Sequence, residues 1–386
     1  MLPKKLKQKL DIRKQNQSFR QLGNSKQHID FSSNDYLGFA QSKVIFEQAH
    51  QYLITHNYIQ NGATGSRLLS GNHQLYSEVE QQISKFHNSQ SALIFNSGYD
   101  ANLGFFSSVP QRGDIILYDE YCHASIRDGI AMSHAKAYKF EHNNLEELER
   151  LIHRYSELIS ESHHEIYVVT ESIFSMDGDA PDLKGLSELC KNQHTHLIID
   201  EAHAVGVFGE NGNGLISDLQ LENFVFARII TFGKALGSHG AAILCHQSLK
   251  DYLINFSRSF IYTTALPPHA LATIKTSYNT ISIQSDNETS PIQKLHHNIT
   301  FFKAELKRLG LLHLFIPSHS AIQSCIIHGN ENAKQTALKL EDHGFDVKAI
   351  LSPTVSKGKE RLRFCIHSYN SSEEITKVLQ LLAIFV

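Results

Sequence analysis

The chain has 386 residues, 41% of them hydrophobic and 19% charged, so it is long enough for two or three domains and can bury a large apolar core. Lysine and arginine total 36 against 39 aspartates and glutamates, and the net charge of −3 argues against a general nucleic-acid binder, which needs a basic face to displace counterions. The longest apolar runs, 241–245 and 381–386, fall far short of the roughly 20 residues of a membrane-spanning helix, so we expect no membrane segment.

The first 27 residues hold eight lysines and arginines but a single acid, Asp11. No apolar block follows them, so we expect no secretory signal and interpret these residues as a solvated, amphipathic segment of an N-terminal arm that extends over 1–40. The five cysteines lie far apart and form no C-x-x-C pair, which is typical of buried thiols in a reducing compartment. We therefore expect a cytoplasmic protein.

Short apolar segments alternate with amphipathic ones through the middle of the chain. The apolar segments are often β-branched, as in strands that are covered on both faces. They are 92–95, 115–118, 137–140, 166–170, 197–199, 229–232 and 241–245. One amphipathic stretch, 145–155, has a helical stripe of apolar residues, and Asn143 with Glu146 three residues later predicts its start. This alternation predicts an α/β domain over 41–275, with a parallel-rich sheet between helices.

The pattern changes after about residue 268. A helix-rich stretch leads to two segments with strand-like alternation, 321–327 and 361–366. In the second, Arg361 and Arg363 lie on one face and apolar side chains on the other. We expect a smaller α+β domain over 276–386 that presents these arginines on its outer face or on a cleft.

The residues that follow the predicted strands are the candidates for chemistry, because ligands of α/β sheets bind beyond the carboxyl ends of the strands. Gly98 and Tyr99 open a helix directly after the first strand, where free backbone N–H groups suit a phosphate. The polar residues after the later strands lie in 119–123, 171–178, 200–203 and 232–234. Each alone has a structural explanation, such as a cap or a core histidine. Together they predict a functional site, since burying many polar groups is costly unless they have partners.

Several common sites do not match the sequence. Lys234 follows a glycine but precedes an alanine, so it does not belong to a Walker loop, which needs Ser or Thr there. Gly212 and Gly214 lack the third glycine of the dinucleotide fingerprint. His194 and His196 have no third ligand at suitable spacing, so we expect no metal, and no G-x-S-x-G nucleophile motif occurs.

The remaining candidates are a lysine, a strand-end aspartate and a phosphate-binding edge. Pyridoxal phosphate requires such a set: a lysine for the Schiff base, an acid for the ring nitrogen and donors for the phosphate. Lys234 and Asp200 supply the first two. We therefore expect pyridoxal 5′-phosphate as the cofactor of the large domain.

Seven segments, spread in order over nearly the whole chain, carry a resemblance to a known family. They are Phe31-Ser-Ser-Asn-Asp-Tyr-Leu-Gly38, Gly62-Ala-Thr-Gly-Ser-Arg-Leu-Leu-Ser-Gly71, Phe174-Ser-Met-Asp-Gly178, Asp200-Glu-Ala-His203, Thr231-Phe-Gly-Lys-Ala-Leu-Gly237, Phe260-Ile-Tyr-Thr-Thr264 and Arg361-Leu-Arg363. The chain resembles the α-oxoamine synthases, pyridoxal-phosphate enzymes with the aspartate aminotransferase fold (fold type I). The resemblance implies a large, cofactor-binding, parallel-rich sheet domain and a smaller α+β C-terminal domain.

The resemblance also implies a role for each matching residue. Lys234 holds the cofactor and moves the α proton, Asp200 pairs with the pyridinium nitrogen, and His203 hydrogen-bonds the ring hydroxyl. His123 stacks on the ring and contacts the substrate. The phosphate is held by the main chain around Gly98 and Tyr99, together with Ser175 and Thr231. Thr264 reaches the phosphate of a neighbouring subunit's cofactor, which implies a homodimer with shared active sites.

For the substrates, the resemblance favours family members that join L-alanine to a pimeloyl thioester in biotin biosynthesis. Members that use glycine or serine are the alternative. Arg363 is implied to bind the carboxylate of the amino acid and Asn34 to contact the substrate, while Arg20 and Thr354 match positions that contact the acyl substrate. The sequence leaves open whether coenzyme A or an acyl carrier protein brings the thioester.

The implied reaction is a decarboxylative condensation. The α proton of alanine is removed, the α carbon attacks the thioester carbonyl, the thiol leaves and carbon dioxide is lost. Two other classes of function stay open: a catalytically inactive dimeric scaffold that kept the fold, and a nicotinamide-dependent dehydrogenase. The joint presence of Lys234, Asp200, His123 and Arg363 argues against a scaffold.

Overall fold

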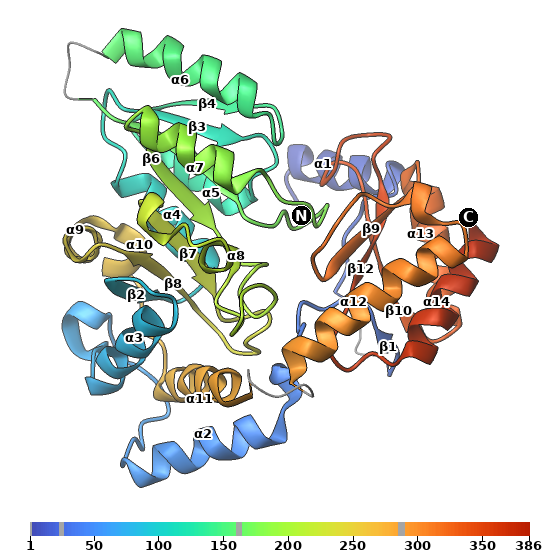
Figure 1. The fold of residues 1–386 in the computed structure, drawn as a ribbon, viewed down its shortest axis with the longest axis horizontal. Helices are drawn as coiled ribbons and strands as arrows, with labels where there is room; N and C mark the ends of the chain where they lie inside the picture. Colours follow the sequence, from blue (N-terminus) through green and yellow to red (C-terminus); the bar gives the residue numbers. More distant parts are fainter. Residues whose placement is uncertain (1, 23–26, 160–163, 285–289) are drawn as a thin grey trace. The chain divides into compact units, whose positions relative to one another are not determined.

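The computed structural model describes residues 2–22, 27–159, 164–284 and 290–386, and the chain divides into two compact units (Figure 1). Unit 1 comprises Met1–Tyr36, Ser175–Asp179 and Gln293–Val386. Unit 2 comprises Leu37–Phe174 and Ala180–Ile292. Each unit is described by its own elements below.

Unit 2 is built on a seven-stranded sheet in the order β2-β8-β7-β6-β5-β3-β4 (Figure 1). The strands are β2 (Ser91–Phe95), β3 (Ile115–Asp119), β4 (Lys136–Phe140), β5 (Ile166–Glu171), β6 (His196–Asp200), β7 (Ala227–Thr231) and β8 (Ala241–Cys245). β8 runs antiparallel to both of its neighbours, and the pairs from β7 through to β4 are all parallel. The predicted parallel-rich sheet and its seven strand segments are confirmed.

Helices cover both faces of this sheet. They are α2 (Lys43–Thr55), α3 (Gln74–Phe86), α4 (Gly98–Ser108), α5 (Ala124–Met132), α6 (Leu145–Ile159), α7 (Leu183–Asn192), α8 (Leu215–Asp218), α9 (Gln247–Phe256), α10 (Arg258–Ile261) and α11 (Pro268–Gln284), with the short η1 (Phe39–Gln41), η2 (Arg67–Gly71) and η3 (Glu222–Phe224). Side chains of α4, α5, α9 and α10 form one core with the sheet, and those of α6, α7 and α8 form another. Successive side chains of a strand point to opposite faces of the sheet. Because helices cover both faces, the strand side chains on either face are buried.

Unit 1 combines small sheets with helices, as the predicted α+β domain does. Its elements are α1 (Lys4–Gln15), β1 (Ile29–Asp30), α12 (Pro291–Arg308, of which the last sixteen residues belong to this unit), η4 (Leu312–Leu314), β9 (Ile322–Ile326), α13 (Asn330–Asp342), β10 (Phe345–Asp346), β11 (Lys348–Ile350), β12 (Arg361–Cys365) and α14 (Ser372–Phe385). β11, β12 and β9 form an antiparallel sheet, and β1 pairs with β10 in parallel. A capping box of Ser371 and Glu374 begins α14.

The two arginines of β12 are not on an outer face. Arg361 is 2% exposed and Arg363 is 7% exposed. Within unit 1, Arg361 forms an ion pair with Asp177, and Arg363 donates to the main-chain oxygen of Ser175. The alternation was correctly predicted, but the segment 175–179 from the middle of the chain, rather than solvent, contacts this side of the strand.

The start of α6 also differs from the prediction by one residue. The side chain of Asn144, not that of Asn143, accepts a hydrogen bond from the main-chain N–H of Glu147 at 2.9 Å. Asn143 instead adopts a left-handed backbone conformation with φ of 57°. Asparagine tolerates this conformation better than most residues, so the second of two adjacent asparagines is free to cap the helix.

Helix α1 of the N-terminal arm has no buried residue, in agreement with a solvated arm. Across the described residues, none of the helices combines the length and the apolar character that crossing a membrane requires.

One buried histidine of unit 2 is held in its neutral form. His87 is 0% exposed, with Nδ1 at 3.0 Å from the main-chain oxygen of Asn213 and Nε2 at 2.8 Å from the hydroxyl of Tyr278. Burial, together with the charge of Arg228, lowers the pKa of His87 to about 3. The folded protein therefore does not protonate this ring at mildly acidic pH.

We predict that His87 makes the protein less stable as the pH falls. The unfolded chain protonates this histidine near pH 6.5 and the folded chain does not, so the free energy of unfolding decreases by up to about 1.4 kcal/mol per pH unit below that point. Denaturant unfolding between pH 7 and pH 5 measures the slope. His87→Gln should flatten it, whereas the control His134→Gln, at an exposed site, should not. Equal slopes in all three proteins would contradict this role.

Candidate functional site

The carboxyl ends of the central strands of unit 2 bring polar residues to one edge of the sheet. β3, β5, β6 and β7 are parallel and end at Asp119, Glu171, Asp200 and Thr231. Glu171 and Asp200 are direct partners in the β5–β6 register. The predicted convergence of strand-end residues within unit 2 is therefore present.

Lys234 lies in the connection between β7 and β8, next to His203. Its amine nitrogen Nζ is 2.9 Å from Nε2 of His203, which follows β6. The connection is tight: the N–H of Gly237 donates to the main-chain oxygen of Lys234, and Gly237 has φ of 58°. A Cβ at this glycine would lie 2.1 Å from the main-chain nitrogen of Ala40, so glycine is required where the lysine loop meets a neighbouring segment.

Asp200 is held by donors on both of its carboxylate oxygens. Oδ1 accepts from the main-chain N–H of Ala202 at 2.9 Å, and Oδ2 accepts from the side chain of Asn102 at 2.9 Å. The residue is only 6% exposed, so these two bonds replace the water that burial removes. Each oxygen keeps a lone pair that is available to a further donor.

The same asparagine connects Asp200 to His123. Asn102 Nδ2 also donates to Oγ of Ser125 at 3.1 Å, and that hydroxyl lies 2.8 Å from Nδ1 of His123. The main-chain N–H of Ser125 donates to the same ring nitrogen at 3.2 Å. Because Nδ1 accepts this bond, the neutral ring carries its proton on Nε2.

Two pKa values at this edge are shifted. Partial loss of solvation lowers the pKa of His123; the charge of Lys234 adds to this effect and that of Asp200 opposes it. Burial and the neighbouring Asp200 carboxylate raise the pKa of Glu171 to about 8. Glu171 also accepts the main-chain N–H of His123 at 2.6 Å. Shifts of this kind are frequent at functional sites.

The start of α4 forms an anion-binding position. Ser97 caps the helix by accepting the N–H of Asp100, and the N–H groups of Gly98 and Tyr99 have no acceptor among the described residues. A Cβ at Gly98 would lie 2.6 Å from Cγ2 of Thr231, so the helix start and the end of β7 approach closely. This arrangement suits a phosphate group.

Two of the predicted cofactor contacts lie at the surface of unit 2. The ring of Tyr99 is 45% exposed, and its hydroxyl hydrogen-bonds Asp128. Thr264 is exposed, and its main-chain oxygen accepts from the side chain of Asn96 at 2.7 Å. Their side chains are thus available to ligands from outside this unit.

The remaining predicted residues belong to unit 1 and form two separate groups of contacts there. Arg363 donates from Nε to the main-chain oxygen of Ser175 at 2.7 Å and from Nη2 to Oδ1 of Asn34 at 2.9 Å. Arg20 donates to the hydroxyl of Thr354 at 3.2 Å, and both are exposed. The structure thus gathers Arg363 with Asn34 and Ser175, and separately Arg20 with Thr354.

Two residues of this site, Asn102 and Ser125, were not predicted from the sequence, and Glu171, which lies in the predicted polar segment 171–178, was given no role. A usable signal exists for Asn102, which is a polar residue on the otherwise apolar face that α4 turns to the core. Buried polar side chains are hydrogen-bonded, so a polar residue on such a face indicates a partner. Glu171 is the last residue of the buried strand β5 and directly follows the apolar run 166–170, from which that strand was predicted.

Comparisons with known proteins agree on a family. The family model described as Aminotransferase class I and II matches residues 26–382. The 8-amino-7-oxononanoate synthase of Emericella nidulans is 38% identical over 375 residues, which cover 92% of this chain and 88% of that protein. The protein of the same name from Lysinibacillus sphaericus is 35% identical over 358 residues, covering 92% and 88%.

Solved structures agree as well. A serine palmitoyltransferase from S. paucimobilis superposes with a TM-score of 0.85 at 27% identity, covering 93% of this chain and 87% of that one. An 8-amino-7-oxononanoate synthase from Francisella tularensis superposes with a TM-score of 0.76 at 29% identity, covering 92% and 97%.

Asn102→Ala should weaken cofactor binding. The change removes the donor to Asp200 and to Ser125, and hydrogen bonds to charged groups contribute about 1.5–3 kcal/mol. We predict that the Kd for pyridoxal phosphate, measured by titrating the cofactor-free protein and following visible absorbance, rises at least tenfold. Asn255→Ala, at an exposed position, is the control and should bind as the wild type does. Wild-type affinity in Asn102→Ala would remove this residue from the site.

Proposed function

The chain belongs to the class I and II aminotransferase family, and from that membership we propose that it condenses L-alanine with a pimeloyl thioester to give 8-amino-7-oxononanoate, a step of biotin biosynthesis. It is a pyridoxal-phosphate enzyme of the acyltransferase type. The observation that supports this reaction best is the placement of the Lys234 amine 2.9 Å from His203, in the unit whose sheet edge also holds Asp200.

The residues of unit 2 fit the cofactor by their chemistry. When bound, pyridoxal phosphate supplies an aldehyde for an amine and a ring that delocalises an electron pair from the α carbon. We assign Lys234 to the aldehyde, Asp200 to the ring nitrogen and His203 to the ring hydroxyl. Asp200 has a spare lone pair on each oxygen and two donors that hold it in place, as that role requires.

The phosphate group and the ring face have their own residues. The two N–H groups of Gly98 and Tyr99 that have no described acceptor, at the positive end of α4, bind the phosphate with Thr231. Ser175 keeps its predicted phosphate role in this proposal. The exposed ring of His123 stacks on the cofactor, and the bond that Ser125 donates to Nδ1 fixes its orientation.

The carboxylate of the amino acid is assigned to Arg363. The guanidinium is held by Ser175 and Asn34, so its plane is fixed before a ligand arrives. A planar guanidinium binds a carboxylate through two parallel hydrogen bonds. Arg20 and Thr354, which are hydrogen-bonded to each other, are assigned to the acyl substrate.

Proton transfer is assigned to the amine of Lys234. When the amine of Lys234 is free, it removes the α proton of alanine, because an amine positioned beside the substrate can act as a general base. The α carbon then bonds to the thioester carbonyl carbon and the thiol leaves. Loss of carbon dioxide leaves an electron pair on the same carbon, and a proton delivered from Lys234 completes the amino ketone.

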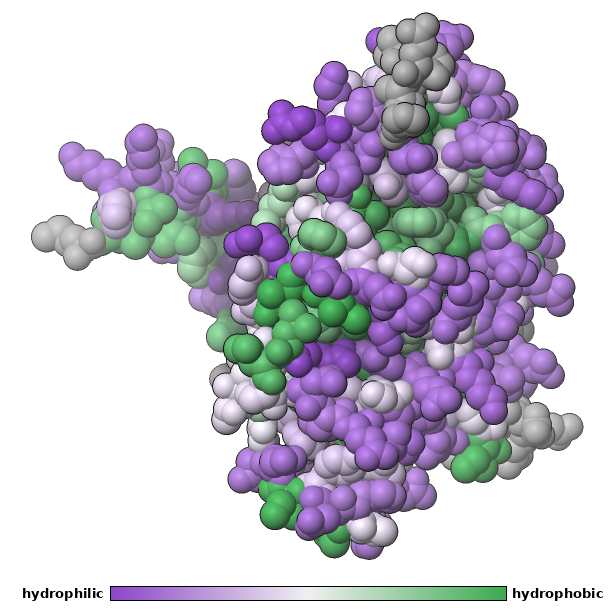
Figure 2. Space-filling model, turned by 90° about the vertical axis from the view of Figure 1, so that its left-hand side faces the viewer, coloured by the Kyte–Doolittle hydropathy of each residue, from purple (hydrophilic) through white to green (hydrophobic). Residues whose placement is uncertain are grey.

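A homodimer is part of the proposal. Thr264 is exposed in one chain, and the resemblance assigns it to the cofactor phosphate of a neighbouring subunit. Unit 2 exposes large apolar side chains, among them Leu69 at 85% and Tyr262 at 73%. The face drawn in Figure 2 is mostly hydrophilic but carries a concentrated apolar patch, and such patches mark interaction sites. The mass of the protein in solution tests this assembly.

The cytoplasm is the proposed compartment. All five cysteines are buried thiols, although a chain of this kind in an oxidising compartment would commonly form disulfides. Fractionation of cells that express the chain tests this assignment.

A serine-using reaction is the second candidate. The serine palmitoyltransferase structure superposes with a TM-score of 0.85, above the 0.76 of the 8-amino-7-oxononanoate synthase structure. Sequence identity favours the 8-amino-7-oxononanoate synthases: it is 29% with that solved structure against 27% with the serine palmitoyltransferase structure, and 38% with the Emericella nidulans protein. The amino-acid specificity separates the two.

Lys234→Ala should abolish turnover without unfolding the protein. The side chain is half-buried and belongs to no apolar core, so its loss removes chemistry rather than packing. We expect kcat to fall by about 10²–10⁴-fold or more, with thermal unfolding nearly unchanged. Borohydride reduction of the wild type followed by peptide mapping should find the cofactor on Lys234. Lys184→Ala, at an exposed site, is the control, and a map that names another lysine would refute the assignment.

The substrate panel is the decisive test of the reaction. Alanine, glycine and serine are each offered with pimeloyl and palmitoyl thioesters, and release of thiol and carbon dioxide is measured. We expect alanine with the pimeloyl thioester to give the highest kcat/KM. Preference for glycine, or for serine with palmitoyl, would reassign the chain to another reaction of the α-oxoamine synthases.

A further inference from the structure

Unit 1 surrounds the guanidinium of Arg363 with two buried side chains that have no role in the proposed chemistry. Tyr36 and Cys365 are both 0% exposed. The hydroxyl of Tyr36 donates to Oδ1 of Asn34 at 3.2 Å. The sulfur Sγ of Cys365 accepts from Nη1 of Arg363 at 3.0 Å. We call Arg363, which is assigned to the carboxylate of the amino acid, and its partner Asn34 the carboxylate clamp.

Each nitrogen of the Arg363 guanidinium has an acceptor within unit 1. Nε donates to the main-chain oxygen of Ser175 at 2.7 Å, and Nη2 donates to Oδ1 of Asn34 at 2.9 Å. Nη1 has the thiol sulfur of Cys365. Three acceptors around one planar group fix both its plane and its rotation. A guanidinium has five N–H groups, so it can still donate to a ligand after these three bonds are made.

The side-chain amide of Asn34 has one favourable orientation. Its Oδ1 faces three donors, which are Nη2 of Arg363, the hydroxyl of Tyr36 and, at 3.8 Å, the thiol of Cys365. If the amide were turned over, its NH₂ group would face the guanidinium, and two donors cannot bond each other. Nδ2 has no acceptor among the described residues, and the side chain is half-buried, so this group is left to donate to a ligand.

The phenol of Tyr36 stays a donor. Burial raises the pKa of Tyr36 well above its ordinary value, although the charge of Arg363 opposes this effect. The hydroxyl therefore keeps its proton at physiological pH and directs it to the amide oxygen of Asn34. An ionised phenol would instead compete with a carboxylate for the guanidinium.

The main chain of the segment 31–36 is held without the help of these two side chains. The main-chain N–H of Cys365 donates to the oxygen of Phe31, and that of Ser368 donates to the oxygen of Tyr36, both at 2.8 Å. These bonds fix the backbone on either side of the asparagine of the clamp. The hydroxyl and the thiol are therefore left to orient side chains, and their removal should not displace the segment.

We propose that Tyr36 and Cys365 are positioning residues of the carboxylate clamp: the hydroxyl fixes the amide, and the thiol fixes the guanidinium, before the amino acid binds. Donors that are already oriented bind a ligand without paying for reorganisation. The inference rests on the proposed function, because the ligand of the clamp is the carboxylate of the amino-acid substrate.

The clamp contacts the part that all amino acids share. Loss of either positioning residue should therefore weaken the binding of alanine, glycine and serine by the same factor and leave the preference among them unchanged. A residue that lined a pocket for the amino-acid side chain would instead change that preference.

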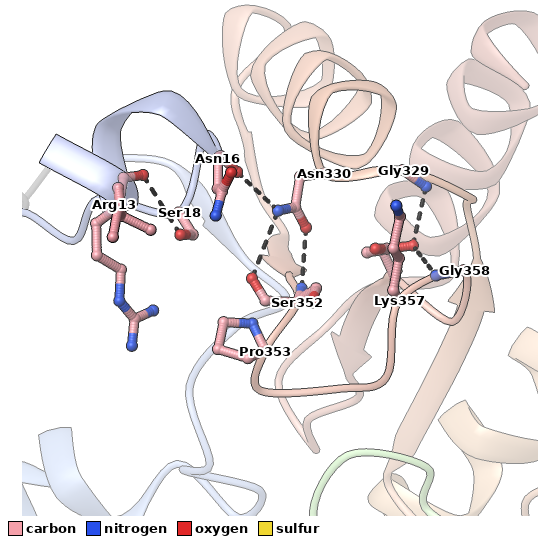
Figure 3. A pocket seen from close by; sticks show the side chains of 11 residues that line it. Arg13, Asn16, Ser18, Gly329, Asn330, Ser352, Pro353, Lys357 and Gly358 are labelled. Atoms are coloured by element: carbon pink, nitrogen blue, oxygen red, sulfur yellow. Dashed lines mark hydrogen bonds between the residues drawn. The ribbon is translucent and has the colours of Figure 1, made fainter. Parts of the chain in front are cut away.

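The acyl substrate is assigned to other residues of unit 1. They are Arg20 and Thr354, and Thr354 directly follows Pro353, which lines a pocket of about 880 Å³ (Figure 3). The lining of that pocket includes neither the clamp nor its two positioning residues. Changes at Tyr36 and Cys365 should therefore leave KM for the thioester within about twofold of the wild-type value.

Binding of the amino acid alone tests the hydroxyl. The cofactor-loaded protein is titrated with L-alanine in the absence of a thioester, and visible absorbance gives the Kd. Tyr36→Phe keeps the ring and removes one hydrogen bond, so the Kd should rise about three- to tenfold. The control Tyr369→Phe removes a hydroxyl that bonds Asp30, beside the same segment, and should bind as the wild type does. A wild-type Kd in Tyr36→Phe would overturn the role of the hydroxyl.

Three variants test the thiol by the same titration. Cys365→Ala removes the acceptor and should raise the Kd about three- to tenfold, whereas Cys365→Ser keeps an acceptor and should stay close to the wild type. Cys325→Ala is the matched control, because this thiol is buried in β9 of the same sheet and makes no hydrogen bond among the described residues. A Kd that follows thermal stability rather than the presence of an acceptor would overturn the role of the thiol.

Steady-state kinetics separate this inference from the proposed reaction. In Tyr36→Phe, KM for alanine should rise while kcat, the Kd for the cofactor and thermal unfolding stay near the wild type. If serine with a palmitoyl thioester is the better substrate pair and the Kd values of all three amino acids rise by one factor, the proposed reaction falls and the positioning role stands. A changed ratio of alanine to glycine, or a loss of kcat alone, would overturn the positioning role while the reaction stands. No absorbance change with any amino acid in the wild type would overturn both.

Discussion

The burial of the Asp200 carboxylate is the constraint on which the site of unit 2 depends. A carboxylate that is 6% exposed is costly unless donors replace the lost water, and here Ala202 and Asn102 are those donors. Since Asn102 comes from α4 and Ala202 from the turn after β6, the helix and the strand end must keep their positions for the charge to be tolerated. Asp200 therefore fixes the geometry in which Lys234 and His203 meet.

The same network gives a physical reason for the state of His123. The side-chain amide of Asn102 donates to the hydroxyl oxygen of Ser125, and the main-chain N–H of Ser125 donates to Nδ1 of the ring. A ring that accepts at Nδ1 stays neutral more easily, which agrees in direction with the lowered pKa of His123. Glu171 completes the support, because it accepts the main-chain N–H of the same histidine. The orientation of the ring thus follows from residues that make no assigned contact with a ligand.

The sheet could be predicted from the sequence because its strands are apolar runs. The ends of several strands were predicted too early because the last residue of each is polar. The predicted strands stop one residue before Asp119, Glu171 and Asp200, although the backbone continues to pair there. Lys234 and Asp200 were predicted because motifs carry them, and Gly98 because it opens a helix directly after the first predicted strand. Asn102 and Ser125 were not, because their meeting depends on how α4 packs beside α5, which no local pattern encodes.

A catalytically inactive scaffold fits this arrangement poorly. A scaffold gains stability when buried polar groups are replaced by apolar ones of similar shape, and buried carboxylates in particular cost stability unless they are paired. Unit 2 keeps Asp200 and Glu171 side by side in the β5–β6 register, and burial together with the neighbouring Asp200 carboxylate raises the pKa of Glu171 to about 8. It also keeps an amine against His203. A purely structural unit is expected to avoid placing such charges together, and departures from this expectation occur where a protein must bind and transform a charged ligand.

A nicotinamide-dependent enzyme would need a glycine-rich turn for its pyrophosphate, whereas the turn that opens α4 offers two main-chain N–H groups, enough for one phosphate.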